Sequence, residues 1–132
     1  MSLDPLNTRV RHLFGNLLHA GTAGTVASGV RSVSGEAGRE QRGTRVRFTL
    51  YLNDSDPIEV RYQAYGCPHT LAVCEWLAGE LECGRGPCVG GPADWARTLG
   101  VPAAKLGRLL VVEDALQAAL AQIGPGRENV VK

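Results

Sequence analysis

Residues 64–77, AYGCPHTLAVCEWL, contain the point where the sequence changes from the pattern of a strand to that of a helix. Before Gly66, apolar and polar side chains alternate, as they do in a half-buried strand. After Cys67, apolar side chains recur at helical spacing, and proline is favoured in the first turn of a helix. The stretch therefore predicts a strand that ends at Gly66 and a helix that begins at Pro68, with Cys67 as its N-cap. The alternating apolar side chains are Ile58, Val60, Tyr62 and Ala64, and the helical ones are Leu71, Cys74, Leu77, Ala78 and Leu81.

The segments before this stretch predict a hairpin preceded by weaker elements. Residues 44–52 alternate apolar and polar side chains, and the turn-forming sequence NDSDP at 53–57 leads into the strand described above. Residues 25–33 predict a further strand, whereas 34–43, SGEAGREQRG, predict a turn or a mobile loop because they are rich in glycine. An apolar stripe over 5–19 predicts an N-terminal helix.

The segments after this stretch predict helices. Residues 82–91 predict a loop, Pro92–Leu99 a short helix, 102–123 a long amphipathic helix, and 124–132 a C-terminal tail. Strands are thus followed by helices, which is typical of an α+β domain. We expect residues 1–132 to form one domain, in which helices pack on one face of a three-stranded antiparallel sheet.

Composition limits the classes of function. The 132 residues are 44% hydrophobic and 20% charged with a net charge of +1, which is typical of a globular protein and gives no general reason to expect nucleic acid as a partner. No stretch approaches the roughly 20 apolar residues that span a bilayer, and the N-terminus does not resemble a signal peptide. We therefore expect no membrane partner, a cytoplasmic location and reduced cysteines. We expect the one local basic cluster to be a solvated hairpin edge; it consists of Arg39, Arg42, Arg45 and Arg47.

Cys67 is the strongest candidate for a functional residue. At a helix N-cap its sulfur faces free backbone N–H groups and the positive end of the helix dipole, which favour the reactive thiolate. The alternative is a structural cysteine that happens to precede a helix. Cys74 lies on the apolar stripe, and we expect it in the core.

The remaining cysteines and histidines carry weaker signals. Cys83 and Cys88 flank four residues, a spacing that could close over a metal or a disulfide but equally fits two free thiols. His69 could turn toward the ligand space of Cys67, or it could be solvated or cap the helix. His19 belongs to the predicted N-terminal helix and indicates no site of its own.

Four segments in order resemble the iron–sulfur cluster assembly scaffold family, the IscU/NifU N-terminal-like domain. VRHLFGNLLHAG (10–21) resembles the family's "V..HY.NP.N.G" segment, and YQAYGCPHTLAVCEWL (62–77) resembles its strand, "FGC" and helix. DWARTLGVPAAKL (94–106) is similar to "DIA..L.LPPVKL", and VVEDALQAAL (111–120) to the terminal "LAEDAI.AAL" helix. The resemblance implies an IscU/NifU-like (SufE-like) fold and a non-enzymatic scaffold or carrier.

The resemblance also implies a site that this chain has altered. The family holds an iron–sulfur cluster or a zinc ion through three cysteines, and Cys67 matches the middle one. In register, Arg42 and Arg108 stand where the other two would be, and the chaperone-recognition segment LPPVK has become VPAAK at 101–105. Chaperone docking is therefore doubtful, whereas a cysteine desulfurase or another cluster-assembly protein is an expected partner.

Three outcomes are compatible with the loss of these ligands. His69, Cys83 and Cys88 could rebuild a metal site with Cys67, or several chains could each contribute Cys67. Alternatively, metal binding is lost, and Arg42 and Arg108 form an anion or persulfide pocket that lowers the pKa of the thiol. We expect a divergent scaffold that binds or carries iron, zinc or sulfur through Cys67. The alternatives are a persulfide carrier with sulfurtransferase-like activity, and a metal-free adaptor.

Overall fold

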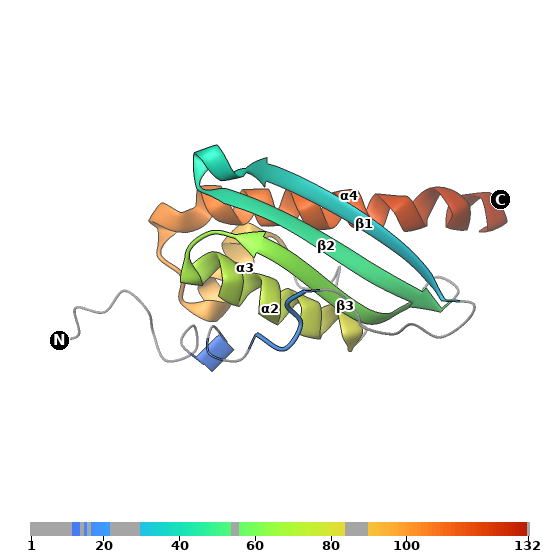
Figure 1. Cartoon of the computed structure of the whole chain (residues 1–132), viewed down its shortest axis with the longest axis horizontal. Helices are drawn as coiled ribbons and strands as arrows, with labels where there is room; N and C mark the ends of the chain where they lie inside the picture. The colour runs from blue at the N-terminus through green and yellow to red at the C-terminus, as the bar shows by residue number, and fades with distance from the viewer. Residues whose placement is uncertain are drawn as a thin grey trace.

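The computed structural model describes residues 12–13, 15, 17–21, 30–53, 56–83 and 90–131 of the 132, with side chains as far as 123 and without those of 56 and 57. Three strands are followed by helices along the chain, as expected for an α+β domain (Figure 1). Strand β1 (Arg31–Arg39) pairs with β2 (Thr44–Asn53), and β2 pairs with β3 (Asp56–Tyr65). Both pairings are antiparallel, and the sheet order is β1-β2-β3.

Within the described chain, three α-helices cover one face of the sheet (Figure 1). They are α2 (Pro68–Glu82), α3 (Pro92–Leu99) and α4 (Leu106–Val131), and a 3₁₀ turn, η3 (Ala103–Lys105), precedes α4. Helix α4 packs mainly on β1 and β2, α2 packs on β3, and α3 packs on α4. The predicted three-stranded sheet with helices on one face is confirmed.

The core lies between the sheet and these helices. Every second residue of β2 points into it, because side chains alternate between the two faces of a strand. The side chains supplied by β2 are fully buried, and α2 and α4 complete the cluster. Burial on this scale is the main stabilising contribution to such a fold. The fully buried β2 side chains are Val46, Phe48, Leu50 and Leu52.

The prediction of a mobile loop at 34–43 is wrong, because β1 occupies most of it and the turn to β2 is a 3₁₀ turn, η1 (Glu40–Arg42). The glycines that suggested a loop have a packing role instead. A Cβ atom at Gly35 would lie 2.1 Å from the backbone nitrogen of Ala119 in α4. Gly35 thus lets the helix backbone approach the strand closely, which no larger side chain would allow.

Two other boundaries differ from expectation. Helix α4 runs to Val131 and so includes most of the predicted tail at 124–132. The pairing of β2 with β3 shifts register at Tyr51 and Leu52, and Ile58, expected on the buried stripe, is half exposed beside this irregularity. Most of the predicted N-terminal helix at 5–19 lies outside the described residues.

The outer edge of β3 is covered by a short N-terminal segment. Ala20 forms a parallel bridge with Tyr62, the Tyr62 N–H donates to the His19 carbonyl at 3.0 Å, and the Gly21 N–H donates to the Tyr62 carbonyl at 2.7 Å. Further along this edge, the Val60 N–H donates to a carboxylate oxygen of Glu82 at 2.7 Å. Backbone groups that would otherwise be open for pairing with another strand are therefore satisfied here.

Candidate functional site

Cys67 lies at the junction between β3 and α2 and is the N-cap of α2, as predicted, with Pro68 in the first turn. Its side chain is partly exposed, and Sγ lies 3.5 Å from Oγ1 of Thr70, one turn into the helix. A Cβ atom at Gly66 would lie 3.2 Å from the Thr70 side chain, so Gly66 gives Thr70 room to face the sulfur. The local sequence therefore positions both the thiol and a hydroxyl donor for it.

The surroundings of Cys67 favour its ionised form. Partial burial alone would raise the pKa of the thiol, but hydrogen bonds from the Thr70 hydroxyl and from the backbone N–H groups of Thr70 and His69 lower it. The positive charge of Lys105, in η3, lowers it further. The net effect is a pKa below the ordinary value for cysteine. A partly exposed thiol with a lowered pKa is typical of a reactive cysteine.

Arg42 and Arg108 lie together in one groove, whose lining does not include Cys67. Both line a groove of about 630 Å³ between the β1–β2 turn and the start of α4, and Arg39 joins them there. Cys67 is not part of its lining, and the cation that acts on Cys67 is Lys105. Ala104 lines the groove and Lys105 follows it, so the thiol and the groove lie at the same end of the sheet, connected by η3.

The expected accessory ligands are not assembled at Cys67. Cys83 is the C-cap of α2, at the other end of the helix that Cys67 begins. With a rise of about 1.5 Å per residue, the two cysteines are about 24 Å apart, so the prediction that Cys83 rebuilds a site with Cys67 is wrong. Cys88 lies outside the described residues. His69 is 2% exposed, and its backbone N–H donates to the sulfur.

The residues at Cys67 do not fit a family-style cluster or zinc site. Across the described ranges, no three side chains of His, Cys, Asp or Glu are placed to hold a metal ion. Such sites require about four ligands with deprotonated sulfur or nitrogen, and arginine remains protonated. Cys74 is fully buried, which raises the pKa of its thiol, and its expected place in the core is confirmed.

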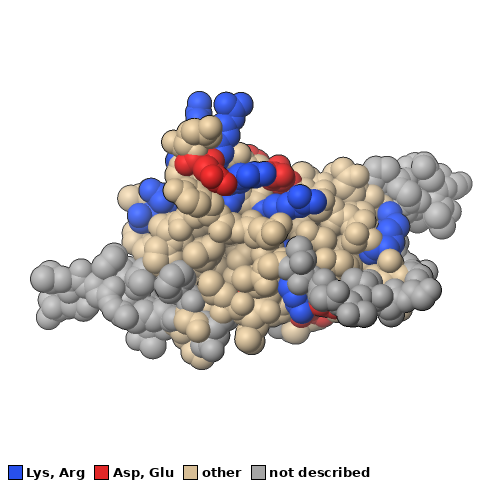
Figure 2. Space-filling model, in the orientation of Figure 1, with Lys and Arg blue, Asp and Glu red and all other residues tan. Residues whose placement is uncertain are grey.

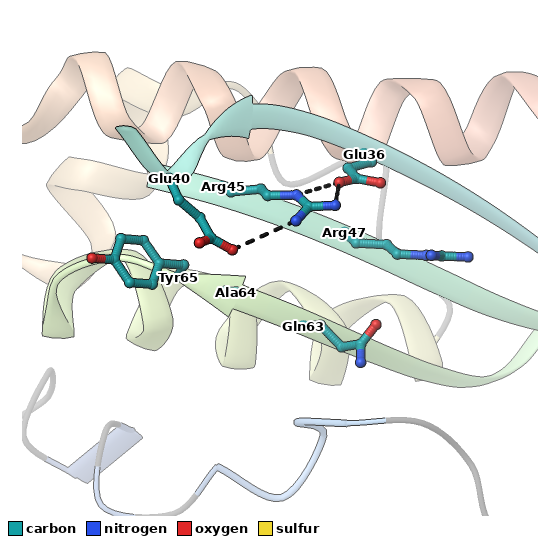
Figure 3. A pocket seen from close by; sticks show the side chains of 7 residues that line it. All are labelled: Glu36, Glu40, Arg45, Arg47, Gln63, Ala64 and Tyr65. Carbon is teal, nitrogen blue, oxygen red and sulfur yellow. Dashed lines mark hydrogen bonds and ion pairs between the residues drawn. The ribbon is translucent and has the colours of Figure 1, made fainter. Parts of the chain in front are cut away.

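The open face of the sheet carries a second pocket, in which the charges are balanced (Figure 3). Arg45 points between two carboxylates, pairing with Glu36 and lying 3.5 Å from Glu40. Arg47 donates a hydrogen bond to the Ser34 hydroxyl at 3.3 Å. The expected solvated edge thus divides into two parts: Arg45 and Arg47 on the open face have partners on β1 or η1, whereas Arg39 and Arg42 line the groove.

Sequence reasoning missed three residues of this region. Thr70 could have been found, because it lies three residues after the N-cap, where a side chain can reach back to the capping residue. Lys105 has a signal only through the segment VPAAK, and Arg39 was taken as a solvated residue. Neither cation can be placed beside Cys67 or in a groove until the order of the strands is known.

A partly buried charged cluster at the edge of β3 was also missed. In this cluster, named here the His19 cluster, the ring of His19 contacts Glu75 through Nδ1 and Glu82 through Nε2, the latter at 2.9 Å. The backbone N–H of His19 and the hydroxyl of Tyr62 both donate to Glu75, at 2.9 and 3.1 Å. Arg61 donates to Glu82 at 3.1 Å. A ring with a carboxylate on each nitrogen is best satisfied as imidazolium.

The ionisation of the His19 cluster follows from these contacts. Burial would lower the pKa of His19, but hydrogen bonds to Glu75 and Glu82 and their negative charge outweigh burial and raise it. Burial would raise the pKa of Glu82, but the Val60 N–H, His19 and Arg61 lower it. Burial and the charge of Glu75 raise the pKa of Tyr62, which stays neutral. Each group in the cluster has a partner, which indicates a structural role.

Comparisons with known proteins do not assign this chain to a family. Neither a scan against protein-family models nor a search of curated proteins finds a match. Among the described residues, no helix combines the length and apolar character that crossing a membrane requires. The function must therefore be argued from the site itself.

Proposed function

We propose that this protein is a sulfur carrier of the iron–sulfur assembly type, which holds a persulfide on Cys67. The observation that carries the proposal is the partly exposed Cys67 thiol at the N-terminus of α2, whose pKa is lowered by Thr70, by backbone N–H groups and by Lys105. The thiolate is the form that attacks sulfur donors. The same donors and the same cation would stabilise the anionic persulfide that results.

Two further observations support a relationship to the IscU/NifU-like fold. The register of the resemblance maps the family's three ligands to positions 42, 67 and 108, which are far apart in the sequence. Arg42 and Arg108 share a groove, and η3 connects that groove to Cys67 at the same end of the sheet. We therefore infer that the chain keeps the architecture of a cluster-assembly scaffold and has changed what the site holds.

The proposed step is a persulfide exchange. The Cys67 thiolate attacks the outer sulfur of a persulfide on the donor, which we infer to be a cysteine desulfurase. A sulfur–sulfur bond forms on Cys67, the sulfur–sulfur bond of the donor breaks, and the donor cysteine leaves as a thiolate. One thiolate is consumed and one is released, so the exchange needs no further oxidant or reductant.

A divergent metal scaffold is the competing function. It would need ligands in addition to Cys67, and none of the described side chains joins Cys67 to form a group of three. Several chains that each contribute Cys67 would satisfy this need. Metal analysis of the protein purified without oxygen separates the two functions, because only a scaffold would lose stoichiometric iron or zinc in Cys67→Ser.

The direct test is intact-mass measurement after incubation with a cysteine desulfurase and L-cysteine. We expect a gain of one sulfur atom that a thiol reductant removes. The gain should be absent in Cys67→Ser and retained in Cys83→Ser, a matched control because Cys83 is an exposed cysteine at the other end of α2. A gain that persists in Cys67→Ser would contradict the proposal, provided that circular dichroism shows the variant to be folded.

A further inference from the structure

The groove beside η3 has an unusual balance of charge. Arg39, at the end of β1, Arg42, in η1, and Arg108, in the first turn of α4, all line it. No described acidic side chain forms an ion pair with any of them. Three guanidinium groups that share one groove without a described acidic partner repel one another, and a bound anion would reduce that repulsion.

Other arginines of the described chain show the contrast. Arg45 pairs with Glu36, Arg61 pairs with Glu59 and Glu82, and Arg97 pairs with Asp94. On the sheet face shown in Figure 2, basic side chains lie among acidic ones and form no continuous basic track. Arg31, Arg47 and Lys105 also have no ion pair with a described acidic side chain, but the groove brings three such cations together in one lining.

The walls of the groove add fixed polar groups. Thr44 lines it although only 4% of the residue is exposed, so its side chain is held in place by the surrounding structure. Gly107 and Arg108 bring the first turn of α4 to the groove, and the positive end of its helix dipole favours an anion there. On the opposite wall, Gly38 has φ +88°, and an added Cβ would lie 2.2 Å from the Thr44 carbonyl oxygen. The backbone is thus closely packed at this wall, and only glycine fits at position 38.

We propose that this groove is a binding site for a compact polyanion, a small molecule that carries several phosphate or carboxylate oxygens. Guanidinium groups bind both kinds of oxyanion in a bidentate manner. A volume of about 630 Å³ lies within the range of small-molecule sites. Extended nucleic acid is disfavoured, because the acidic partners of Arg45 interrupt the positive surface next to the groove. The site does not depend on sulfur transfer by Cys67.

The test is a titration of the full chain with pyrophosphate and with citrate, followed by calorimetry and by backbone amide shifts. We expect saturable binding with shifts at Gly38, Thr44 and Gly107. Each of Arg42→Gln and Arg108→Gln should weaken binding by about tenfold, since a charge-assisted contact contributes about 1.5 kcal/mol or more. The tighter of the two probes identifies phosphate or carboxylate as the preferred group.

Controls distinguish this site from general attraction and from the proposed function. Arg97→Gln removes an exposed arginine that is paired with Asp94 on α3, and it should leave binding unchanged. Cys67→Ser should also bind normally, whatever the outcome of the sulfur-transfer test. The inference is overturned if neither probe binds saturably, if Arg97→Gln weakens binding as much as Arg42→Gln, or if a single-stranded oligonucleotide binds more tightly than pyrophosphate.

Discussion

Helix α2 has a charged group without an ion-pair partner at its N-terminal end and fully paired charged groups in its second half. At the N-terminal end, Cys67 is partly exposed, and the groups around it favour a negative charge that has no fixed counterion in direct contact. In the second half, Glu75 and Glu82 are held by His19, and Glu75 is only 5% exposed. The same helix therefore carries a reactive thiol that is accessible for chemistry and, in its second half, carboxylates whose hydrogen-bond and charge partners are already in place.

The difference shows how function and stability can be separated in this molecule. A buried charge with its partners contributes to the fold only as a complete set, because removal of one partner leaves another charge unpaired in a region of low dielectric. Substitution of a surface group whose charge is only partly neutralised changes the free energy of unfolding little, because water solvates the group in both states. We therefore expect substitutions in the His19 cluster to affect folding and substitutions around Cys67 to affect chemistry.

The largest effect should follow from Glu75→Gln. This change keeps the shape of the side chain but removes the negative charge that faces the His19 ring and accepts from Tyr62. We expect the free energy of unfolding to fall by about 3 kcal/mol, as when one partner of a buried ion pair is removed. Urea denaturation measures this loss of stability. Asp114→Asn, an exposed change on α4, is the control. If the two variants lose equal stability, the His19 cluster is not structural.

A smaller effect should appear in the dependence of stability on pH. The pKa of His19 is raised from 6.5, so its contribution is complete below about pH 6.5 and is lost as the pH rises through the higher value of the folded state. The pKa of Glu82 is lowered from 4.5, so its contribution is complete above about pH 4.5 and is lost as the pH falls through the lower folded value. His19 and Glu82 together contribute most to the free energy of unfolding between about pH 4.5 and about pH 6.5.

Thermal unfolding across this range provides the measurement. The midpoint temperature should be highest near pH 5 to 6, about the interval between the two ordinary values, and should decline on the alkaline side. His19→Gln should remove most of the alkaline decline, because Glu75, Glu82, Tyr62 and Arg61 would then face a group that does not titrate. If the midpoint temperature of His19→Gln still declines on the alkaline side as in the unaltered protein, titration of His19 does not cause the decline.

The smallest effects on stability and the clearest effects on chemistry are expected at Cys67. Thr70→Val should raise the pKa of the thiol, and Lys105→Gln should raise it less, because the Thr70 contacts lower this pKa more than the charge of Lys105 does. The pH dependence of alkylation by iodoacetamide reports this pKa, in a Cys83→Ser/Cys88→Ser background. A larger shift in Lys105→Gln than in Thr70→Val would reverse the assigned order of causes.

Much of the architecture could be predicted from local patterns. The alternation in β2 and β3 and the helical spacing after Pro68 are consequences of burial on one face, which the sequence records directly. The strand predicted at 25–33 overlaps β1 only at 31–33, and the rest of β1 could not be found this way. Gly35 weakens a strand in isolation, and only the close approach of α4, some eighty residues later, makes glycine favourable there.

The site was predictable only in its local part. The N-cap position of Cys67 follows from Gly66 and Pro68, but the groove around Arg42 and the partners of His19 depend on contacts between distant segments. His19 lies 56 residues before Glu75, so nothing near it in the sequence indicates a charged cluster. Arg42 and Arg108 line the same groove, and Cys67 is not part of that lining, so the predicted arginine pocket around the thiol stays a prediction.

The bridge between Ala20 and Tyr62 has a consequence for the order of events in folding. The strands form an antiparallel meander whose turns close over short distances, whereas His19 and Glu82 are 63 residues apart. Contacts that close long loops tend to form late, after the surfaces that they join. We therefore expect the segment at 19–21 to dock last and to contribute little to the transition state. Its contacts would then mainly slow unfolding and would have little effect on the rate of folding. His19 would therefore determine the lifetime of the native state rather than the rate at which it forms.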